Sequence, residues 1–209
     1  MDELVAAGFD IAQTIDVLAA AGFDIAHAFD AAVLAREPGL EALAAHGRVG
    51  LLVGNTRALW RPFVAAADRT RAHPLQHYTE TIVERALPGR RIYYAHRTYD
   101  GAYVPFQRLA AAAGLAALAP TQLLVHPIYG PWFALRAVAF VDGDPPPAPQ
   151  RVVLPCTCGA ACTSALARAS DDWRDWLAVR DACPIGRTFR YSDAQIRYHY
   201  TKDPSWLRA

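Results

Sequence analysis

The clearest strand and turn signals in the chain lie in residues 122–141, which read QLLVHPIYGPWFALRAVAFV. Two apolar, strand-like runs, residues 122–125 and 132–141, lie on either side of residues 127–131, which are rich in turn-forming proline and glycine. Apolar runs of this length separated by turn residues are typical of paired strands. We therefore predict an antiparallel hairpin with a wide loop.

The rest of the chain alternates further strand and helix patterns. Strands are predicted at residues 48–55 and 91–97, and helices at 56–63, 74–87, 106–118, 173–180 and from Ser192 onward. A near repeat, AAGFDIA at residues 6–12 and 20–26, predicts a pair of short amphipathic helices that end near Pro38. Strands mixed with helices indicate an α+β protein with a layered sheet.

A chain of 209 residues has the size of one ordinary domain. We expect residues 1–143 to form the core. Residues 144–209 hold a proline-rich linker at 144–149, a cysteine segment and C-terminal helices, which we expect to pack on the same core.

Charge and composition exclude several classes of function. The 21 basic residues nearly balance the 20 acidic residues, so nothing indicates binding to nucleic acid or to an anionic membrane. Asp2 and Glu3 stand where a secretory signal carries basic residues, and no apolar run reaches membrane-spanning length. We expect a cytoplasmic protein whose four cysteines are thiols, metal ligands or redox groups rather than disulfides.

Two segments resemble a known family. The stretch HPIYGPWFALR at residues 126–136 resembles the His-Pro-x-Phe-Gly-Gly-Trp-Phe-Ala-Ile-Arg motif of CblC-type cobalamin-processing proteins. WRDWLAVRDA at residues 173–182 and RYSDAQ at residues 190–195 are similar to two later motifs of that family, in the same order. Weaker similarity covers residues 22–24, 55–56 and 61–63.

The resemblance implies a flavin-nitroreductase-like fold with a cavity for base-off cobalamin. It also implies two reactions, which are reductive decyanation with reduced flavin (FMN) and transfer of an alkyl group from cobalamin to glutathione. A homodimer that forms with the cofactor is a further implication. The segment before the expected hairpin is short here, at residues 118–121, and lacks part of the family's cobalamin and flavin contacts.

Most of the cobalamin contacts that the resemblance implies lie in residues 121–133. They are Thr121, Gln122, His126, Pro127, Tyr129, Gly130, Trp132, Phe133 and Trp176. On general grounds His126 is a turn residue bonded to the backbone, whereas the family match favours a place in the corrin pocket. Trp132 and Phe133 point to opposite faces of a strand, and we predict Trp132 for the cofactor side because aromatic contact holds a planar corrin.

Two arginines are the predicted reaction residues. Arg136 lies within an apolar run, where an unpaired guanidinium is costly, so it requires a carboxylate partner or an anion-binding cavity. The structural alternative is a salt bridge to Asp175 or Asp181. By resemblance, Arg136 and Arg180 hold the carboxylates of glutathione, with Arg208 as a third candidate. Asp175 and Asp181 themselves fit a solvated face with local ion pairs.

The cysteines form a separate hypothesis. Cys156, Cys158, Cys162 and Cys183 are proposed as one iron–sulfur or zinc site, because three lie within seven residues and Cys183 precedes a proline. The alternative is thiols without a metal. Two other functions stay open, a cobalamin chaperone without turnover and a flavin reductase for another small molecule.

Overall fold

The computed structural model describes residues 11–147, 152 and 158–207, and it is an α+β protein built on a four-stranded antiparallel sheet. Across the sheet the strands follow the order β1-β2-β8-β3. Their bounds are Ile25–Asp30 for β1, Val49–Asn55 for β2, Arg91–Tyr94 for β3 and Ala134–Val141 for β8. All seven residues of β2 are buried, as the predicted apolar strand requires.

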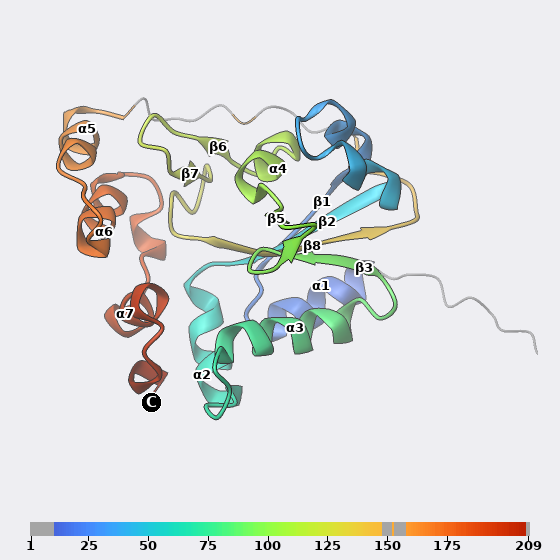
Figure 1. Ribbon diagram of the computed structural model, residues 1–209, viewed down its shortest axis with the longest axis horizontal. Helices are drawn as coiled ribbons and strands as arrows, with labels where there is room; N and C mark the ends of the chain where they lie inside the picture. The colour runs from blue at the N-terminus through green and yellow to red at the C-terminus, as the bar shows by residue number, and fades with distance from the viewer. Residues whose placement is uncertain (1–10, 148–151, 153–157, 208–209) are drawn as a thin grey trace, which may run out of the picture.

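Helices cover both faces of this sheet (Figure 1). One face packs against α1, Ile11–Ala20, α2, Trp60–Ala66, and α3, Pro74–Ala86. The other face packs against the 3₁₀ helices η1, Ala31–Arg36, and η2, Glu41–His46, and against α4, Phe106–Ala112. The sheet is therefore the middle layer of three.

The C-terminal helices stack at one end of the layers (Figure 1). They are α5, Ala160–Ala167, α6, Trp173–Ala182, and α7, Asp193–Thr201, followed by η5, Pro204–Leu207. Tyr198 and Leu207 belong to the same buried cluster as the sheet residues Leu51 and Val53. Of the described helices, none is both long and apolar enough to cross a membrane.

The predicted hairpin is wrong. Leu124–Val125 forms β7, which pairs with β6, Ala117–Leu118, whereas β8 pairs with β2 and β3. Between β7 and β8 only a bridge joins His126 to Gly130. The helix predicted at residues 106–118 is also shorter than expected. It ends at Ala112, and residues 117–118 pair with β7 as strand β6.

The second predicted N-terminal helix is also wrong. Residues 25–30 form β1, which pairs along its whole length with β2. Gly22 starts this change at φ +87°, and a Cβ on it would lie 2.6 Å from the Cα of Leu59. The chain turns there because only glycine combines that conformation with so close an approach.

The remaining predicted elements are present. Thr56 caps η3, Arg57–Leu59, which continues into α2, and α6 and α7 lie where predicted. Ser192 caps α7 by accepting a hydrogen bond from the Gln195 N–H. Short strands β4, Thr98–Tyr99, and β5, Ala102–Tyr103, and the single turn η4, Arg187–Phe189, complete the described fold.

Candidate active site

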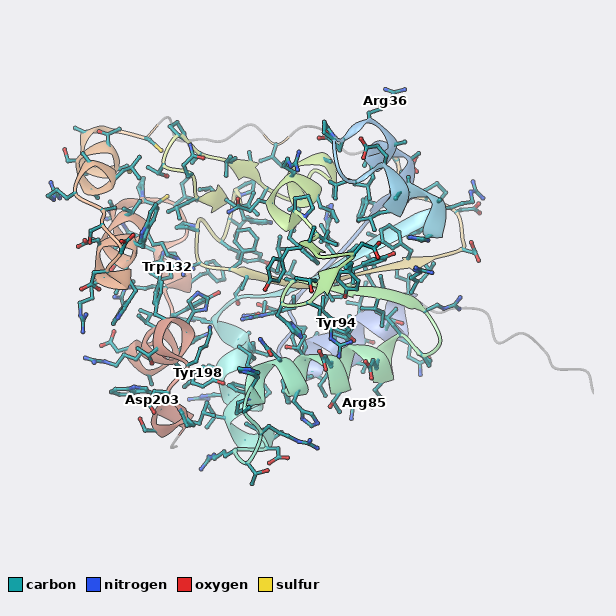
Figure 2. All side chains as sticks on the ribbon, in the orientation of Figure 1. Arg36, Arg85, Tyr94, Trp132, Tyr198 and Asp203 are labelled. Atoms are coloured by element: carbon teal, nitrogen blue, oxygen red, sulfur yellow. The ribbon has the colours of Figure 1, made fainter. Side chains whose placement is uncertain are left out.

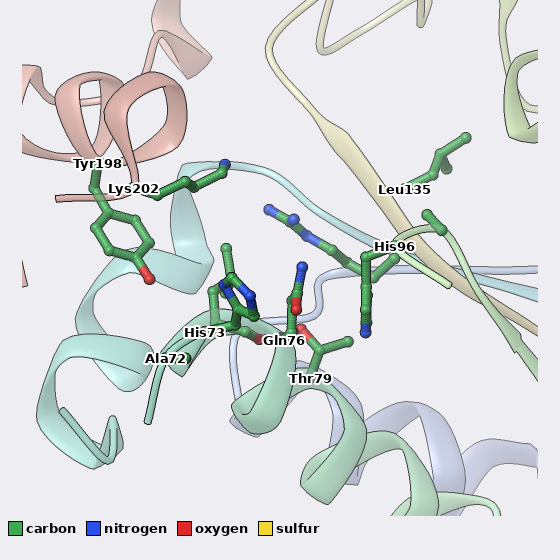
Figure 3. Close-up of a pocket in the computed structure, with 11 residues that line it drawn as sticks. Ala72, His73, Gln76, Thr79, His96, Leu135, Tyr198 and Lys202 are labelled. Atoms are coloured by element: carbon green, nitrogen blue, oxygen red, sulfur yellow. Dashed lines mark hydrogen bonds between the residues drawn. The ribbon is translucent and has the colours of Figure 1, made fainter. Parts of the chain in front are cut away.

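Two cavities lie between the sheet and the C-terminal helices, and both are lined by Leu135 of β8. The first, of about 310 Å³, is the polar cavity and is shown in Figure 3. Its side chains come from α3, the loop after β3, β8 and the end of α7; those used below are His73, Gln76, His96, Arg136, Tyr198 and Lys202. The second, of about 280 Å³, is the aromatic cavity, and it is lined by Phe106, Leu123, Leu124, Phe133, Arg180, His199 and Tyr200 among others.

Arg136 enters the polar cavity from β8. Its Nε donates a 2.7 Å hydrogen bond to Oδ1 of Asn55, a wholly buried residue at the end of β2. Burial lowers the pKa of Arg136, while Tyr191 and Tyr198 oppose this shift. Among the ion pairs of the described residues none includes Arg136, so its charge meets an amide rather than a carboxylate. A guanidinium in that setting is suited to a ligand anion.

The predicted alternative for Arg136, a salt bridge to Asp175 or Asp181, is wrong. Asp175 accepts hydrogen bonds from the backbone and hydroxyl of Ser170, and Asp181 pairs with Arg190 at 2.7 Å. Asp181 thus forms an ion pair near the protein surface, as the solvated-face interpretation predicted, whereas Asp175 is held by Ser170.

A short polar relay orients Asn55 and its neighbour. Asp24 accepts a 2.7 Å hydrogen bond from the Thr56 N–H and a second bond from the Thr56 hydroxyl. The Asn55 amide nitrogen donates to the carbonyl of Thr56. Residues 24 and 55–56, which carried only weak family similarity, therefore position Arg136. The buried Asn55 at the end of an apolar strand was the one signal for this role in the sequence.

Arg180 of α6 reaches the aromatic cavity and is 7% exposed. It donates a 2.6 Å hydrogen bond to the carbonyl of Pro131 and lies over the rings of Trp132 and Tyr191, at 4.6 and 5.2 Å from their centroids. The structure thus brings both predicted arginines to adjoining cavities. Arg208 lies outside the described residues.

His199 lies beside these cations. Burial lowers its pKa well below the usual value, and Lys202, Arg180 and Arg136 lower it further. The imidazole is therefore neutral at physiological pH. Three cations around a neutral histidine create a positive field in a partly dry site.

The tryptophan prediction needs correction. Trp132 is 1% exposed and packs in a cluster with Tyr191 and Ile196, among the C-terminal helices (Figure 2). Phe133, not Trp132, lines the aromatic cavity. The two residues do occupy opposite sides, but the loop that precedes β8 turns Trp132 toward α6 and α7.

His126 takes the structural role weighed for it. Its Nδ1 accepts hydrogen bonds from the backbone N–H groups of Ile128 and Tyr129, and its ring stacks on Tyr129 at 4.3 Å. Burial lowers its pKa to about 4, with a further contribution from His27. His126 is not part of the lining of either cavity.

The other predicted cobalamin contacts also stand apart from the two cavities. Gln122 and Pro127 are exposed, Tyr129 packs on Phe189, and Trp176 is 36% exposed with its indole N–H on the Ser170 carbonyl. Gly130 lies at φ +58° against Ile185. Thr121 is buried next to Cys158.

Three of the four cysteines line one small pocket of about 10 Å³ with Thr121 and Val125; they are Cys158, Cys162 and Cys183. The Cys158 sulfur lies 4.0 Å from the Thr121 hydroxyl and the Cys162 sulfur 3.5 Å from the Ala182 carbonyl. Within the described ranges no three His, Cys, Asp or Glu side chains are arranged to hold a metal ion. Cys156 lies outside these ranges.

Sequence comparison gives no relative, since no protein-family model and no curated protein matches the chain. A solved structure does match. The B12-trafficking protein CblC of C. elegans, described as a homologue of human MMACHC, superposes with a TM-score of 0.70 at 18% identity, over 94% of each chain. The chain therefore shares the fold of a protein from the group that its motifs at residues 126–136 and 173–195 resemble.

Proposed function

We propose that this protein binds cobalamin and promotes removal of its upper ligand, with a small anionic thiol as the second reactant. The observation that carries the proposal is the pair of adjoining cavities, one aromatic and one cationic, in a chain with the fold of a B12-trafficking protein. In this interpretation the sheet and its covering helices are a flavin-nitroreductase-like scaffold.

The lining residues fit such a substrate. Phe106, Phe133 and Tyr200 offer the apolar and aromatic surface that a large planar macrocycle needs. A whole cobalamin is larger than either cavity, so it would lie across both, over the shared Leu135. In such a position the cationic side chains that line the two cavities stay available to bind the second reactant.

The proposed chemistry assigns the arginines to that reactant. Arg136 and Arg180 hold carboxylates of glutathione and place its sulfur against the alkyl group on cobalt. The thiolate sulfur attacks the alkyl carbon and forms a thioether, while the electron pair of the cobalt–carbon bond stays on cobalt. The thiol proton passes to solvent. No side chain forms a covalent bond, so the protein acts by positioning and by its positive field.

Visible spectroscopy tests the substrate assignment. Titration of cobalamin with the protein at neutral pH should shift its absorption bands toward those of the base-off form. Unchanged bands at saturating protein would remove the proposal and favour a flavin reductase that acts on another small molecule. Tight base-off binding without turnover, given either reduced FMN or glutathione, would favour the chaperone.

A second candidate is electron delivery by a metal centre. It rests on the cysteine spacing and on the short segment at residues 118–121, which lacks part of the family's flavin contacts, whereas the three described cysteines line one pocket but are not arranged to hold a metal ion. Anaerobic purification followed by iron, sulfide and zinc analysis tests it. About one cluster or one zinc ion per chain would support a site made by Cys156, Cys158, Cys162 and Cys183. If the protein contains no metal and still carries out the thiol reaction, thiol-dependent dealkylation remains as the proposed function and the metal centre is excluded.

A further inference from the structure

His96 lines the polar cavity from the loop after β3. The backbone N–H of Ala95 donates a 2.9 Å hydrogen bond to the Arg136 carbonyl, so His96 directly follows the pairing of β3 with β8. Figure 3 shows the His96 ring on the side of the cavity away from Lys202 and Tyr198. The proposed binding of cobalamin and thiol does not use this imidazole.

A carboxylate determines which nitrogen of His96 carries the proton. Nε2 of His96 lies 2.8 Å from Oε1 of Glu80 on α3, and Nε of Arg97 donates to the same oxygen at 2.8 Å. Burial raises the pKa of Glu80, but the hydrogen bonds from His96 and Arg97 outweigh burial and leave this pKa below its ordinary value. Glu80 is therefore ionised at neutral pH, and a carboxylate only accepts hydrogen bonds. Nε2 must carry the proton, so in the neutral ring Nδ1 carries the lone pair.

Neighbouring side chains hold the His96 ring in one orientation. The ring of Tyr94 lies 5.5 Å from the ring of His96, and the Arg97 guanidinium lies over Tyr94 at 5.2 Å. In the part of the chain that the structure describes, no hydrogen bond engages Nδ1 of His96. A free lone pair on one nitrogen, with a carboxylate on the other to stabilise the imidazolium, is the arrangement of a general base.

The other groups of the polar cavity are less suited to accept a proton. Arg136 is a cation, and the Lys202 amine donates to the His199 carbonyl. Burial lowers the pKa of Lys202 to about 8, and Arg136 lowers it further, so the amine is still mostly protonated at pH 7. His73 also lines the cavity, but it is exposed, and among the described residues no ion pair includes its ring.

We propose that His96 is the general base of the dealkylation, which takes the proton of the thiol as its sulfur attacks, and that Glu80 positions the imidazole. The inference rests on the proposed function for the reaction, but it concerns the proton of the thiol. The S–H bond breaks and an N–H bond forms at Nδ1, while the sulfur–carbon bond forms and the electron pair of the cobalt–carbon bond stays on cobalt. The His96 side chain is 19% exposed, so the imidazolium then releases this proton to solvent.

Dealkylation of methylcobalamin at saturating glutathione, measured across a range of pH, tests the base. His96→Gln keeps a donor for Glu80 but has no basic nitrogen. A cysteine thiol with its ordinary pKa of about 8.5 is about 3% ionised at pH 7, so the variant should turn over roughly 30-fold more slowly than wild type there. This deficit should vanish above about pH 9.5, where the thiol ionises without a base. His77→Gln, on α3 but outside the lining of the cavity, should match wild type throughout.

The ratio of the two rates isolates His96. Other titratable and charged groups around it are present in both proteins, so their ionisation cancels in the ratio. Besides Glu80 and Arg97, these groups are His73, Glu84, Tyr94, Arg136, Tyr198 and Lys202. Glu80→Gln keeps an acceptor for His96 but no charge to stabilise the imidazolium, so it should lower kcat less than His96→Gln does and leave KM for glutathione unchanged.

NMR of the wild-type protein tests the protonation of His96 without turnover and without cobalamin. Long-range ¹H–¹⁵N correlation, after assignment of the histidines, distinguishes the two neutral tautomers and should place the His96 proton on Nε2 at neutral pH. A proton on Nδ1, a deficit of His96→Gln that persists at alkaline pH, or wild-type turnover by this variant at pH 7 would each overturn the inference. Failure of the proposed function looks different, since cobalamin bands would then stay unchanged or the wild-type protein would not dealkylate, and the role of His96 would fall with it.

Discussion

At the scale of single residues, His126 links loop geometry to pH. Its Nδ1 must stay unprotonated to accept the N–H groups of Ile128 and Tyr129. In the folded state its pKa is lowered to about 4, whereas in the unfolded chain it is near the ordinary value of 6.5. The unfolded state therefore binds more protons between these values, and the folding free energy that His126 contributes above pH 6.5 is lost as pH falls toward 4.

We expect His126→Asn to flatten this pH dependence. Asparagine keeps an acceptor for the turn but does not titrate, so the variant should lack about 2 kcal/mol of the decline in unfolding free energy between pH 6.5 and 4. Urea unfolding of both proteins across this range measures the difference, in which the contributions of the other histidines cancel. Parallel curves for the two proteins would contradict the predicted shift.

Arg136 and Arg180 differ from His126 because each is a cation whose hydrogen-bond partner is neutral, the Asn55 amide for Arg136 and the Pro131 carbonyl for Arg180. Arg136→Ala and Arg180→Ala should lower thiol-dependent dealkylation of methylcobalamin by one to two orders of magnitude, about 1.5–3 kcal/mol each, with a smaller loss of cobalamin affinity. Rates with glutathione and spectral titrations measure the two effects, with Arg168→Ala as the control. Loss of folding or of cobalamin binding in both variants would show that the arginines are structural.

At the scale of helices and strands, the correct predictions are those for which the sequence signal lies within the helix or strand itself. The buried strand 49–55, the α3 helix with its first-turn proline, and the cap Ser192 were predictable because hydrophobic runs and capping residues specify them locally. The pairing of the strands was not predictable, because packing between segments that are far apart in the sequence decides which strands pair. Thus β8 pairs with β2 and β3 rather than with the strand next to it in sequence.

The same limit applies to the site. Arg136 and Arg180 were named as candidates by the family resemblance, and Arg136 also because a charge in an apolar run requires a partner or an anion. Lys202 and His96 were not, because only the folded sheet brings α3, α7 and β8 to one cavity. For Asn55 the sequence showed only a polar residue at the end of an apolar strand, and its contact with Arg136 appears only in the structure. The place of Trp132 depended on the turn before β8, which periodicity does not specify.

The β7–β8 loop depends on a close crossing with the loop between α6 and α7. A Cβ on Gly130 would lie 1.9 Å from the Ile185 carbonyl oxygen, and Gly130 has φ +58°. Gly101 has φ +81° but no atom within 4 Å of its Cβ position. Gly130→Ala should therefore lower the unfolding free energy by at least about 3 kcal/mol, against about 1 kcal/mol for Gly101→Ala. Chemical denaturation measures both, and equal losses would exclude the crossing as the cause.

At the scale of the molecule, the C-terminal helices contribute both core and cavity residues. Tyr198 packs in the cluster of the sheet and α3 while it lines the polar cavity, and Leu207 is wholly buried in that cluster. Arg180 joins α6 to the β7–β8 loop through the carbonyl of Pro131. Removing these helices from the sheet would expose apolar core and open both cavities together.

This coupling predicts one cooperative unfolding transition that cobalamin displaces as a whole. Far-UV circular dichroism and tryptophan fluorescence should give the same midpoint, since Trp60 reports on α2 while Trp132 and Trp173 report on the C-terminal cluster. At a cobalamin concentration of 100 times Kd, the complex should gain about 2.7 kcal/mol, which corresponds to a rise in Tm of roughly 5–10 °C for a chain of this size. Two separate transitions, of which cobalamin raises only one, would instead show that residues 144–209 fold apart from the core.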